Sequence, residues 1–214
     1  MLDDVMDPLL VVLDIDETLV HACRRRVGRR PDFWVSSYAV HKRPFVDEFL
    51  AHVMDNYQVA LWTSSSPGYA HPLVKKLVSE PERLEFVWCS DRCTVRRDPA
   101  TREYYWSKKL AKLKRLGFAL ERIVVVDDSP EKHRQNYGNL IRIEPYEGDP
   151  TDRELLRLIP YLQELAEEPN VRRLEKRGWH TKFDAPRELP RSRFSFFSSL
   201  FPFSFSSSSS STSC

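Results

Sequence analysis

Short apolar runs that recur along the chain constrain its fold more than any other feature. Each run has only four or five residues and none alternates with polar residues, which is typical of strands buried on both faces of a parallel sheet. The runs are Leu9–Leu13, Val59–Trp62, Phe86–Cys89, Ile123–Val126 and Leu140–Ile143. Helical patterns lie between the runs and after the last one. Strands that alternate with helices predict an α/β fold, with a Rossmann-like, mostly parallel sheet flanked by helices.

Single residues mark the expected ends of the helices. The four helical patterns span Pro44–Asn56, Tyr69–Val78, Ser107–Leu116 and Thr151–Ala166. Pro44 suits a first helical turn, Ser107 is the expected N-cap of the third helix, and Gly117 is its expected stop. Pro160 lies inside the fourth pattern and predicts a kink or a break there.

The charge balance and the cysteines narrow the class of protein. Lys and Arg number 33 against 31 Asp and Glu, and this net charge of +2 argues against a protein that coats nucleic acid. A chain of 214 residues can bury a core without disulfides, so Cys23, Cys89, Cys93 and Cys214 are expected to be reduced thiols. The sequence shows no secretory signal pattern and no apolar run of membrane-spanning length. We therefore expect an intracellular protein of the nucleus or cytoplasm.

Composition changes along the chain and predicts four regions. Residues 1–8 form an N-terminal extension, 9–170 the α/β domain, 171–193 a C-terminal extension and 194–214 a tail. The tail holds six Phe and eleven Ser residues and little else, so it is not expected to form a packed core and is predicted to be disordered. The alternative is that its Phe cluster touches a partner or a membrane surface.

Polar residues follow three of the predicted strands at the point where each strand ends. Asp14 and Asp16 follow the first strand, Thr63 and three serines follow the second, and Asp127 and Asp128 end the fourth. The carboxyl ends of parallel strands share one edge of a sheet, and ligands bind there. We therefore expect these side chains to meet in one crevice.

Four carboxylates in one crevice repel each other unless a cation lies among them. Oxygen ligands favour a hard divalent ion, and Mg²⁺ is the expected one. The Thr63 hydroxyl and a lysine, Lys108 or Lys109, would suit an anion beside the metal, and together these groups describe a phosphoryl-transfer site. In such a site Asp14 attacks phosphorus and becomes an aspartyl-phosphate, while Asp16 protonates the leaving oxygen and later takes a proton from water. Each motif taken alone also fits a turn or a helix cap, so only the combination favours this chemistry.

The ordered strings LDIDETLV, LWTSS, KKL and VVVDDSP resemble the haloacid dehalogenase superfamily. The strings ETLVHA, KRPFVDEFL, LWTSSSPGYAHPL and VDDSP are similar to the phosphatases that act on the RNA polymerase II C-terminal domain, including the small nuclear and the dullard-like ones. The resemblance covers about residues 9–165. It implies a fold like that of haloacid dehalogenases and a Mg²⁺-dependent protein serine/threonine phosphatase.

The resemblance also implies roles for individual residues. Asp14 is the implied nucleophile, Asp16 the acid and base, and Lys108 the cation that neutralises the phosphate. The implied catalytic set is Asp14, Asp16, Thr63 and Lys108. The implied substrate-binding residues are Thr63, Ser64, Lys108, Arg97 and Phe33. The implied metal ligands are Asp14, Asp16, Asp127 and Asp128, with Asp16 contributing a main-chain carbonyl.

The chain departs from the family pattern at several places. The small insert after the first motif, residues 19–42, is short and rich in arginine, and Phe33 is a candidate for its apolar pocket. Asp128 stands where the family often has Asn, and the loop of residues 95–106 carries extra residues. The run Arg24–Arg30 steers acidic or phosphorylated substrates, or it is a solvated loop or an import patch.

The spacing of the motifs leaves no room for a large cap domain. An uncapped site is open and admits a phosphorylated segment of another protein. We therefore expect a monomer that acts on a phosphorylated protein or peptide, with no direct nucleic-acid partner. Two alternatives stay open: a non-catalytic binding or scaffold module of the same fold, and a small-molecule phosphatase of the same superfamily.

Overall fold

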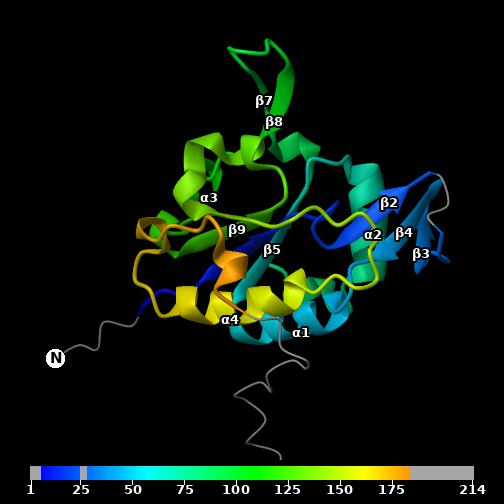
Figure 1. The fold of residues 1–214 in the computed structure, drawn as a ribbon. Helices are drawn as coiled ribbons and strands as arrows, with labels where there is room; N and C mark the ends of the chain where they lie inside the picture. Colours follow the sequence, from blue (N-terminus) through cyan, green and yellow to red (C-terminus); the bar gives the residue numbers. More distant parts are fainter. Residues whose placement is uncertain (1–5, 25–27, 184–214) are drawn as a thin grey trace, which may run out of the picture.

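The computed structural model describes residues 6–24 and 28–183. Its central sheet is parallel, with five strands in the order β10-β9-β1-β5-β6 (Figure 1). The strands are β1 (Leu10–Leu13), β5 (Gln58–Trp62), β6 (Val87–Trp88), β9 (Ile123–Asp127) and β10 (Leu140–Arg142). Each apolar run in the sequence forms one of these strands, so the predicted α/β fold with a mostly parallel sheet is confirmed.

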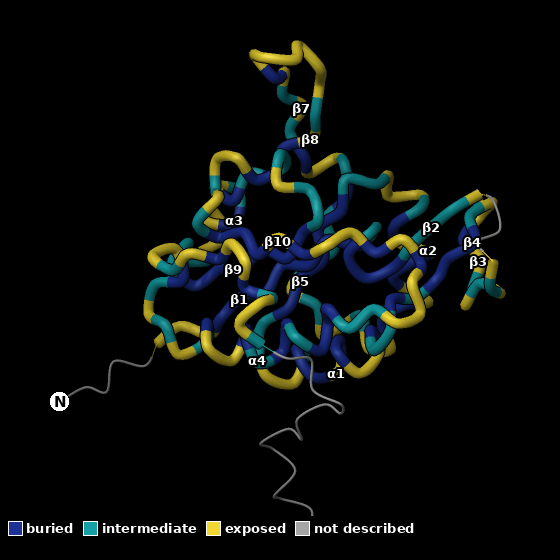
Figure 2. The backbone as a smooth tube through the Cα atoms, in the orientation of Figure 1, coloured by how far each residue is buried: buried dark blue, intermediate teal, exposed yellow. Residues whose placement is uncertain are grey.

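Both faces of the central sheet are buried. Alternate residues of a strand point to opposite faces, so Val11 and Leu13 of β1 join one apolar core while Leu10 and Val12 join another. The larger core is covered by α1 (Val46–Asn56), α2 (Pro67–Leu77) and α4 (Glu154–Ala166), and the smaller one by α3 (Ala111–Lys114). The buried tube at the centre of Figure 2 is this sheet. Polar side chains are therefore excluded from the strands and gather where the strands end.

Two smaller sheets interrupt the α/β alternation. The first is antiparallel, has the order β2-β4-β3, and is formed by β2 (Val20–Cys23), β3 (Phe33–Val35) and β4 (Tyr38–Lys42). It lies where a small insert after the first motif was predicted. The second is a hairpin of β7 (Thr94–Arg97) and β8 (Tyr104–Ser107), which stands away from the body of the molecule (Figure 1). The sequence predicted extra residues here but no strands.

Two of the predicted helix starts are wrong, and of the kink or break predicted at Pro160 the break is absent. Pro44 precedes α1, because Phe45 takes a left-handed conformation with φ 65° and the helix begins at Val46. Ser107 is not an N-cap, because it ends β8 and α3 begins only at Ala111. The predicted break at Pro160 does not occur, because α4 runs through it while its apolar face is buried against the sheet. The predicted stop of the third helix at Gly117 fits its φ of 98°.

Short helical turns complete the chain. They are η1 (Pro81–Arg83), η2 (Ser90–Arg92), η3 (Leu120–Arg122), η4 (Pro130–Asn139), η5 (Val171–Arg173) and η6 (Trp179–Thr181). The last two belong to the predicted C-terminal extension and pack against the domain. Trp179 is buried, stacks on Tyr161 of α4 at 5.4 Å and donates its indole N–H to the Arg142 carbonyl at 2.7 Å. The predicted serine and phenylalanine tail lies outside the described residues.

Two of the described cysteines fit the expectation of reduced thiols, because Cys89 and Cys93 are free and buried. Cys23 Sγ donates a hydrogen bond to the Ala39 carbonyl at 3.9 Å. Cys214 lies outside the described part of the chain. Among the described residues, no helix combines the length and apolar character that a membrane crossing needs.

Candidate active site

Three charged side chains meet where β1 and β9 end. Asp14 follows β1 and Asp127 is the last residue of β9, and both are buried because their strands lie inside the sheet. Lys108, which follows β8, places its Nζ 2.7 Å from Asp14 Oδ1 and 2.5 Å from Asp127 Oδ2. The structure thus brings together residues that are 94 and 19 positions apart in the sequence.

Burial and neighbouring charges set the protonation of this cluster. Burial raises the pKa of Asp14, and the negative charge of Asp127 adds to the rise while Lys108 opposes it. Burial acts in the same direction on Asp127, but Lys108 and His133 outweigh it and hold the pKa of Asp127 well below its usual range. Burial alone would lower the pKa of Lys108, yet the two carboxylates raise it. Asp127 therefore stays ionised as the fixed counter-ion of Lys108.

Asp16 lies beside this cluster on a turn, off the strand. The turn is tight, because the Leu19 amide donates to the Ile15 carbonyl at 2.8 Å and Glu17 has φ 60°. Asp16 Oδ2 accepts hydrogen bonds from Ser65 Oγ at 2.7 Å and from the Thr63 hydroxyl at 3.4 Å. The other oxygen, Asp16 Oδ1, accepts from the Tyr69 hydroxyl at 2.8 Å. The carboxylate of Asp16 is thus aimed by groups at the end of β5 and the start of α2.

Three carboxylates are arranged to hold a cation. Asp14, Asp127 and Asp128 each offer one oxygen, and these atoms lie within 4.8 Å of one another. Asp128 Oδ1 is buried without a hydrogen-bond partner among the described residues. Oxygen ligands of this kind fit a hard ion such as Mg²⁺. The Asp16 carboxylate is outside this group, and a contribution from the Asp16 main-chain carbonyl stays a prediction.

Four further residues lie around the cluster, and only Ser65, one of the three serines after Thr63, was expected there from the sequence. Lys132 Nζ lies 3.4 Å from Asp14 Oδ2 and 3.5 Å from Asp127 Oδ1. Lys108 contacts the other oxygen of each carboxylate. His133 Nε2 lies 2.8 Å from Asp127 Oδ2, and this imidazole is fully buried. Ser65 and Tyr69 hold Asp16. The run of charged residues after Asp128 could have indicated Lys132, whereas nothing local marks Tyr69.

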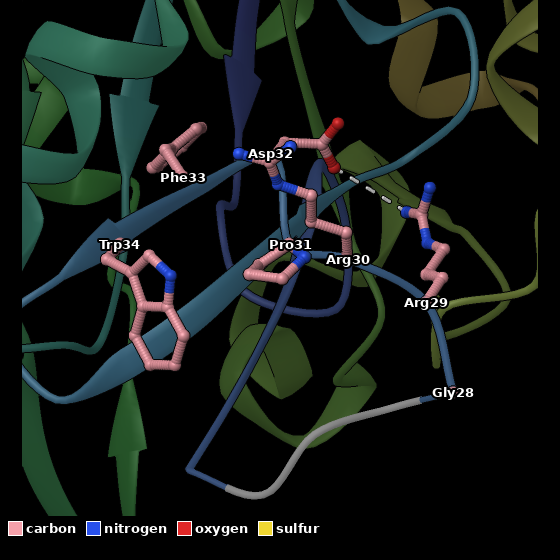
Figure 3. Close-up of a pocket in the computed structure, with 7 residues that line it drawn as sticks. All are labelled: Gly28, Arg29, Arg30, Pro31, Asp32, Phe33 and Trp34. Atoms are coloured by element: carbon pink, nitrogen blue, oxygen red, sulfur yellow. Dashed lines mark ion pairs between the residues drawn. The ribbon is translucent and has the colours of Figure 1, made fainter.

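The remaining predicted substrate residues are Arg97, Ser64 and Phe33. Arg97 is in the β7–β8 hairpin, where its Nε donates to the Arg102 carbonyl at 3.0 Å. Ser64 follows Thr63 and is partly buried. Phe33 lies in β3 and lines a cavity of ≈ 700 Å³ formed by residues 28–34 (Figure 3). Figure 3 also shows the ion pair of Arg29 and Asp32 at 3.7 Å across this cavity.

A second cavity, of ≈ 380 Å³, adjoins the candidate acid and base. It is lined by Asp16, Glu17, Ala22, Tyr38, Ser65, Ser66 and Tyr69. Its lining includes two aromatic rings, those of Tyr38 and Tyr69, which contact each other edge to face with 5.4 Å between the ring centres. This cavity, and not the one beside Phe33, is the space next to the reacting groups.

Comparison with known proteins places the chain in a family. Residues 9–172 match the family model described as NLI interacting factor-like phosphatase. The chain is 33% identical over 170 residues to "CTD small phosphatase-like protein 2" of Dictyostelium discoideum, covering 76% of this chain and 28% of that protein. It is 32% identical over 171 residues to human "CTD small phosphatase-like protein", covering 75% of this chain and 57% of that protein. It is 28% identical over 183 residues to "Nuclear envelope morphology protein 1" of Saccharomyces cerevisiae, covering 77% of this chain and 40% of that protein.

These relatives are longer than the matching region, so the chain spans between 28% and 57% of their length. The match nevertheless includes every strand end that supplies Asp14, Thr63, Lys108 and Asp127. The parallel sheet, the buried cluster and the family model agree with the resemblance read from the motifs. The chain belongs to the NLI interacting factor-like phosphatase family.

Proposed function

We propose that the protein is a Mg²⁺-dependent protein serine/threonine phosphatase that works through an aspartyl-phosphate on Asp14. The observation that carries this proposal is the contact of Lys108 with both Asp14 and Asp127, with Asp16 held on the adjoining turn. A nucleophile, a buried cation and a separate acid at one edge of a sheet are the parts that phosphoryl transfer needs.

In the first step an Asp14 carboxylate oxygen attacks phosphorus and forms the acyl-phosphate bond. The bond from phosphorus to the substrate oxygen breaks, and Asp16 gives its proton to that oxygen. Hydrogen bonds from Tyr69 and Ser65 fix the direction of the Asp16 carboxyl group for this transfer. Lys108 offsets the charge on the phosphoryl oxygens.

In the second step water attacks the phosphorus of the aspartyl-phosphate. Asp16 takes a proton from this water, the acyl-phosphate bond breaks, and inorganic phosphate leaves with Asp14 restored. Asp14, Asp127 and Asp128 would hold Mg²⁺, which supplies further neutralisation of the phosphate when it is bound.

The open surroundings of the site support a protein substrate. Among the described residues, the interval from Asp16 to Arg43 forms the small β2-β4-β3 sheet, and the interval from Thr63 to Lys108 forms α2, β6 and the hairpin. Neither forms a cap over Asp14. The names of relatives, such as "Carboxy-terminal domain RNA polymerase II polypeptide A small phosphatase 2", support a phosphopeptide of that kind as substrate. The free thiols of Cys89 and Cys93 support an intracellular location, in the nucleus or the cytoplasm.

A panel of phosphoserine and phosphothreonine peptides, sugar phosphates and an aryl phosphate tests this proposal. We expect phosphate release from the peptides and the aryl phosphate with Mg²⁺, and none after the metal is removed with a chelator. Release from sugar phosphates alone would point to a small-molecule phosphatase. Peptide binding without any release would point to a binding module.

Mg²⁺ affinity is expected to depend on pH through Asp128. Burial raises the pKa of Asp128 to about 6, with Lys132 opposing the rise and Asp127 adding to it. Below this pKa the carboxyl group carries a proton that the metal must displace, so the Kd for Mg²⁺ should rise about tenfold for each pH unit lost. Above it the Kd should level off. Calorimetric titrations with Mg²⁺, at several pH values between about 5 and about 7.5, measure the Kd.

Asp128→Asn is the control for this pH dependence. An amide cannot take up the proton, so the variant should bind Mg²⁺ more weakly at neutral pH but with a flatter pH profile. Equal slopes in the two proteins would show that Asp128 is not the titrating group.

A further inference from the structure

The β7–β8 hairpin is attached to the candidate active site at both of its ends. Cys93, which precedes β7, donates its Sγ–H to the Thr63 carbonyl at 3.7 Å. Ser107, which ends β8, is buried and is followed directly by Lys108. The rest of the hairpin projects from the body, and its tip is exposed (Figures 1 and 2). A molecule that contacts the hairpin is therefore at the rim of the site.

One face of the hairpin is packed against the protein. Arg96 and Tyr105 pair across the two strands and are both half-buried. Arg134 of η4 lies over the Tyr105 ring at 5.2 Å and forms an ion pair with Asp98 in the hairpin turn. The segment η4 also carries Lys132, whose carbonyl accepts a hydrogen bond from the Lys108 amide at 2.9 Å. These contacts fix the hairpin relative to the reacting groups.

The opposite face is apolar and exposed. Val95 pairs with Trp106, and Arg97 pairs with Tyr104, so these four side chains share that face. Val95 is 52% exposed, Trp106 42% and Tyr104 73%. The Arg97 guanidinium lies 6.0 Å from the centre of the Tyr104 ring. Exposed apolar side chains gathered on one face mark an interaction surface.

The charge of the hairpin selects an anionic partner. Residues 94–107 contain three arginines against two acids, and Asp98 is already paired with Arg134. Arginine and aromatic side chains are the types that most often anchor a bound chain. Arginine in addition pairs well with carboxylates and phosphates.

We infer that the exposed face of the β7–β8 hairpin docks the acidic segment that adjoins the phosphorylated residue of a protein substrate. The inference rests on the proposed function and extends it, because it names the part of the substrate that lies outside the reacting centre. Tyr104 and Trp106 provide the apolar contact, and Arg97 contacts acidic side chains of that segment.

The test compares a long substrate with a short one. The variant Tyr104→Ala/Trp106→Ala is assayed on a phosphoserine peptide with acidic flanks and on an aryl phosphate, which is too small to reach the hairpin. The KM for the peptide should rise about tenfold, as expected for the loss of two aromatic anchors. Both kinetic constants for the aryl phosphate should stay unchanged. The control is Tyr137→Ala, which removes an aromatic side chain that lies outside the hairpin and is 50% exposed. It should change the KM for neither substrate.

A second variant tests the charge. Arg97→Glu should raise the KM for the acidic peptide more than for a peptide with neutral flanks. If the double variant does not fold, this single change still tests whether the hairpin binds the acidic segment. An unchanged KM for the acidic peptide in a variant that folds would overturn the inference. Loss of binding to a single-stranded RNA oligonucleotide with an unchanged peptide KM would overturn it in favour of nucleic acid.

Failure of the proposed function would look different. In that case the unmodified protein would turn over neither substrate, and the anisotropy of a labelled acidic phosphopeptide would decide the docking alone. Weaker binding to Tyr104→Ala/Trp106→Ala than to Tyr137→Ala would support the inference, and equal binding would overturn it.

Discussion

Asp14→Asn is expected to lower the turnover of phosphorylated substrates by about 10⁴-fold or more, as removal of a covalent nucleophile does in other enzymes. The amide cannot form an acyl-phosphate, whereas its oxygen can still accept the hydrogen bond from Lys108. The Lys108–Asp127 ion pair at 2.5 Å remains, so the buried cation keeps a partner and the fold should be retained. Steady-state kinetics on a phosphopeptide measure the loss, and anisotropy of the same peptide should show that binding persists.

Two further variants separate the role of Asp14 from a general charge effect. Asp149→Asn changes an exposed acid that bonds only to its neighbour Thr151 in the described structure, and it should keep full turnover. Asp16→Asn should lower kcat/KM for the phosphopeptide far more than for an aryl phosphate, because kcat/KM reports the first step, in which only the poor leaving group needs a proton. Turnover that survives Asp14→Asn would contradict the aspartyl-phosphate mechanism.

The sequence is sufficient to locate the sheet and its reactive edge. The strands are buried on both faces, so their residues form uninterrupted apolar runs, and the first polar residue after each run marks a strand end. The rule that ligands bind at the carboxyl ends of parallel strands then brings Asp14, Thr63 and Asp127 together. These three side chains therefore lie close together because their parallel strands end at the same edge of the sheet.

Residues that reach the site from beyond the strand ends could not be placed in this way. Lys108 was assigned to the start of a helix, but it directly follows β8, which pairs with β7 in a two-stranded hairpin. Thr, Val, Tyr and Trp in these strands favour extended structure, but the pairing of the two strands is not visible in either strand alone. Lys132, His133 and Tyr69 depend on the paths of η4 and α2, which are set by tertiary packing.

Arg43 joins the turn that carries Asp16 to the start of α4. Its Nε and Nη2 donate to the two carboxylate oxygens of Asp152 at 2.9 Å and 2.7 Å. Its Nη1 donates to the Thr18 carbonyl at 3.1 Å, and Nη2 also donates to the Glu144 carbonyl at 3.0 Å. The guanidinium is fully buried and is the cation paired with Asp152, whose Oδ1 also accepts from the Glu154 amide at 2.9 Å.

Arg43→Met is expected to lower the free energy of unfolding by about 3–5 kcal/mol, because it leaves a partly buried carboxylate and two carbonyls without their donor. The melting temperature should fall by roughly 10 °C. Urea denaturation and a thermal melt measure the two quantities. Arg43→Lys should recover only part of the loss, because an ammonium cannot form the two parallel bonds to Asp152.

Arg83→Met is the matched control, since Arg83 also forms ion pairs, with Asp55 and Glu80, but on the surface. Solvent screens such pairs, so its loss of stability should be much smaller. Thr18 belongs to the turn that positions Asp16, so Arg43→Met should also lower kcat at temperatures where the variant is folded. If Arg43→Met cost no more stability than Arg83→Met, the buried guanidinium would not be what fixes this turn against α4.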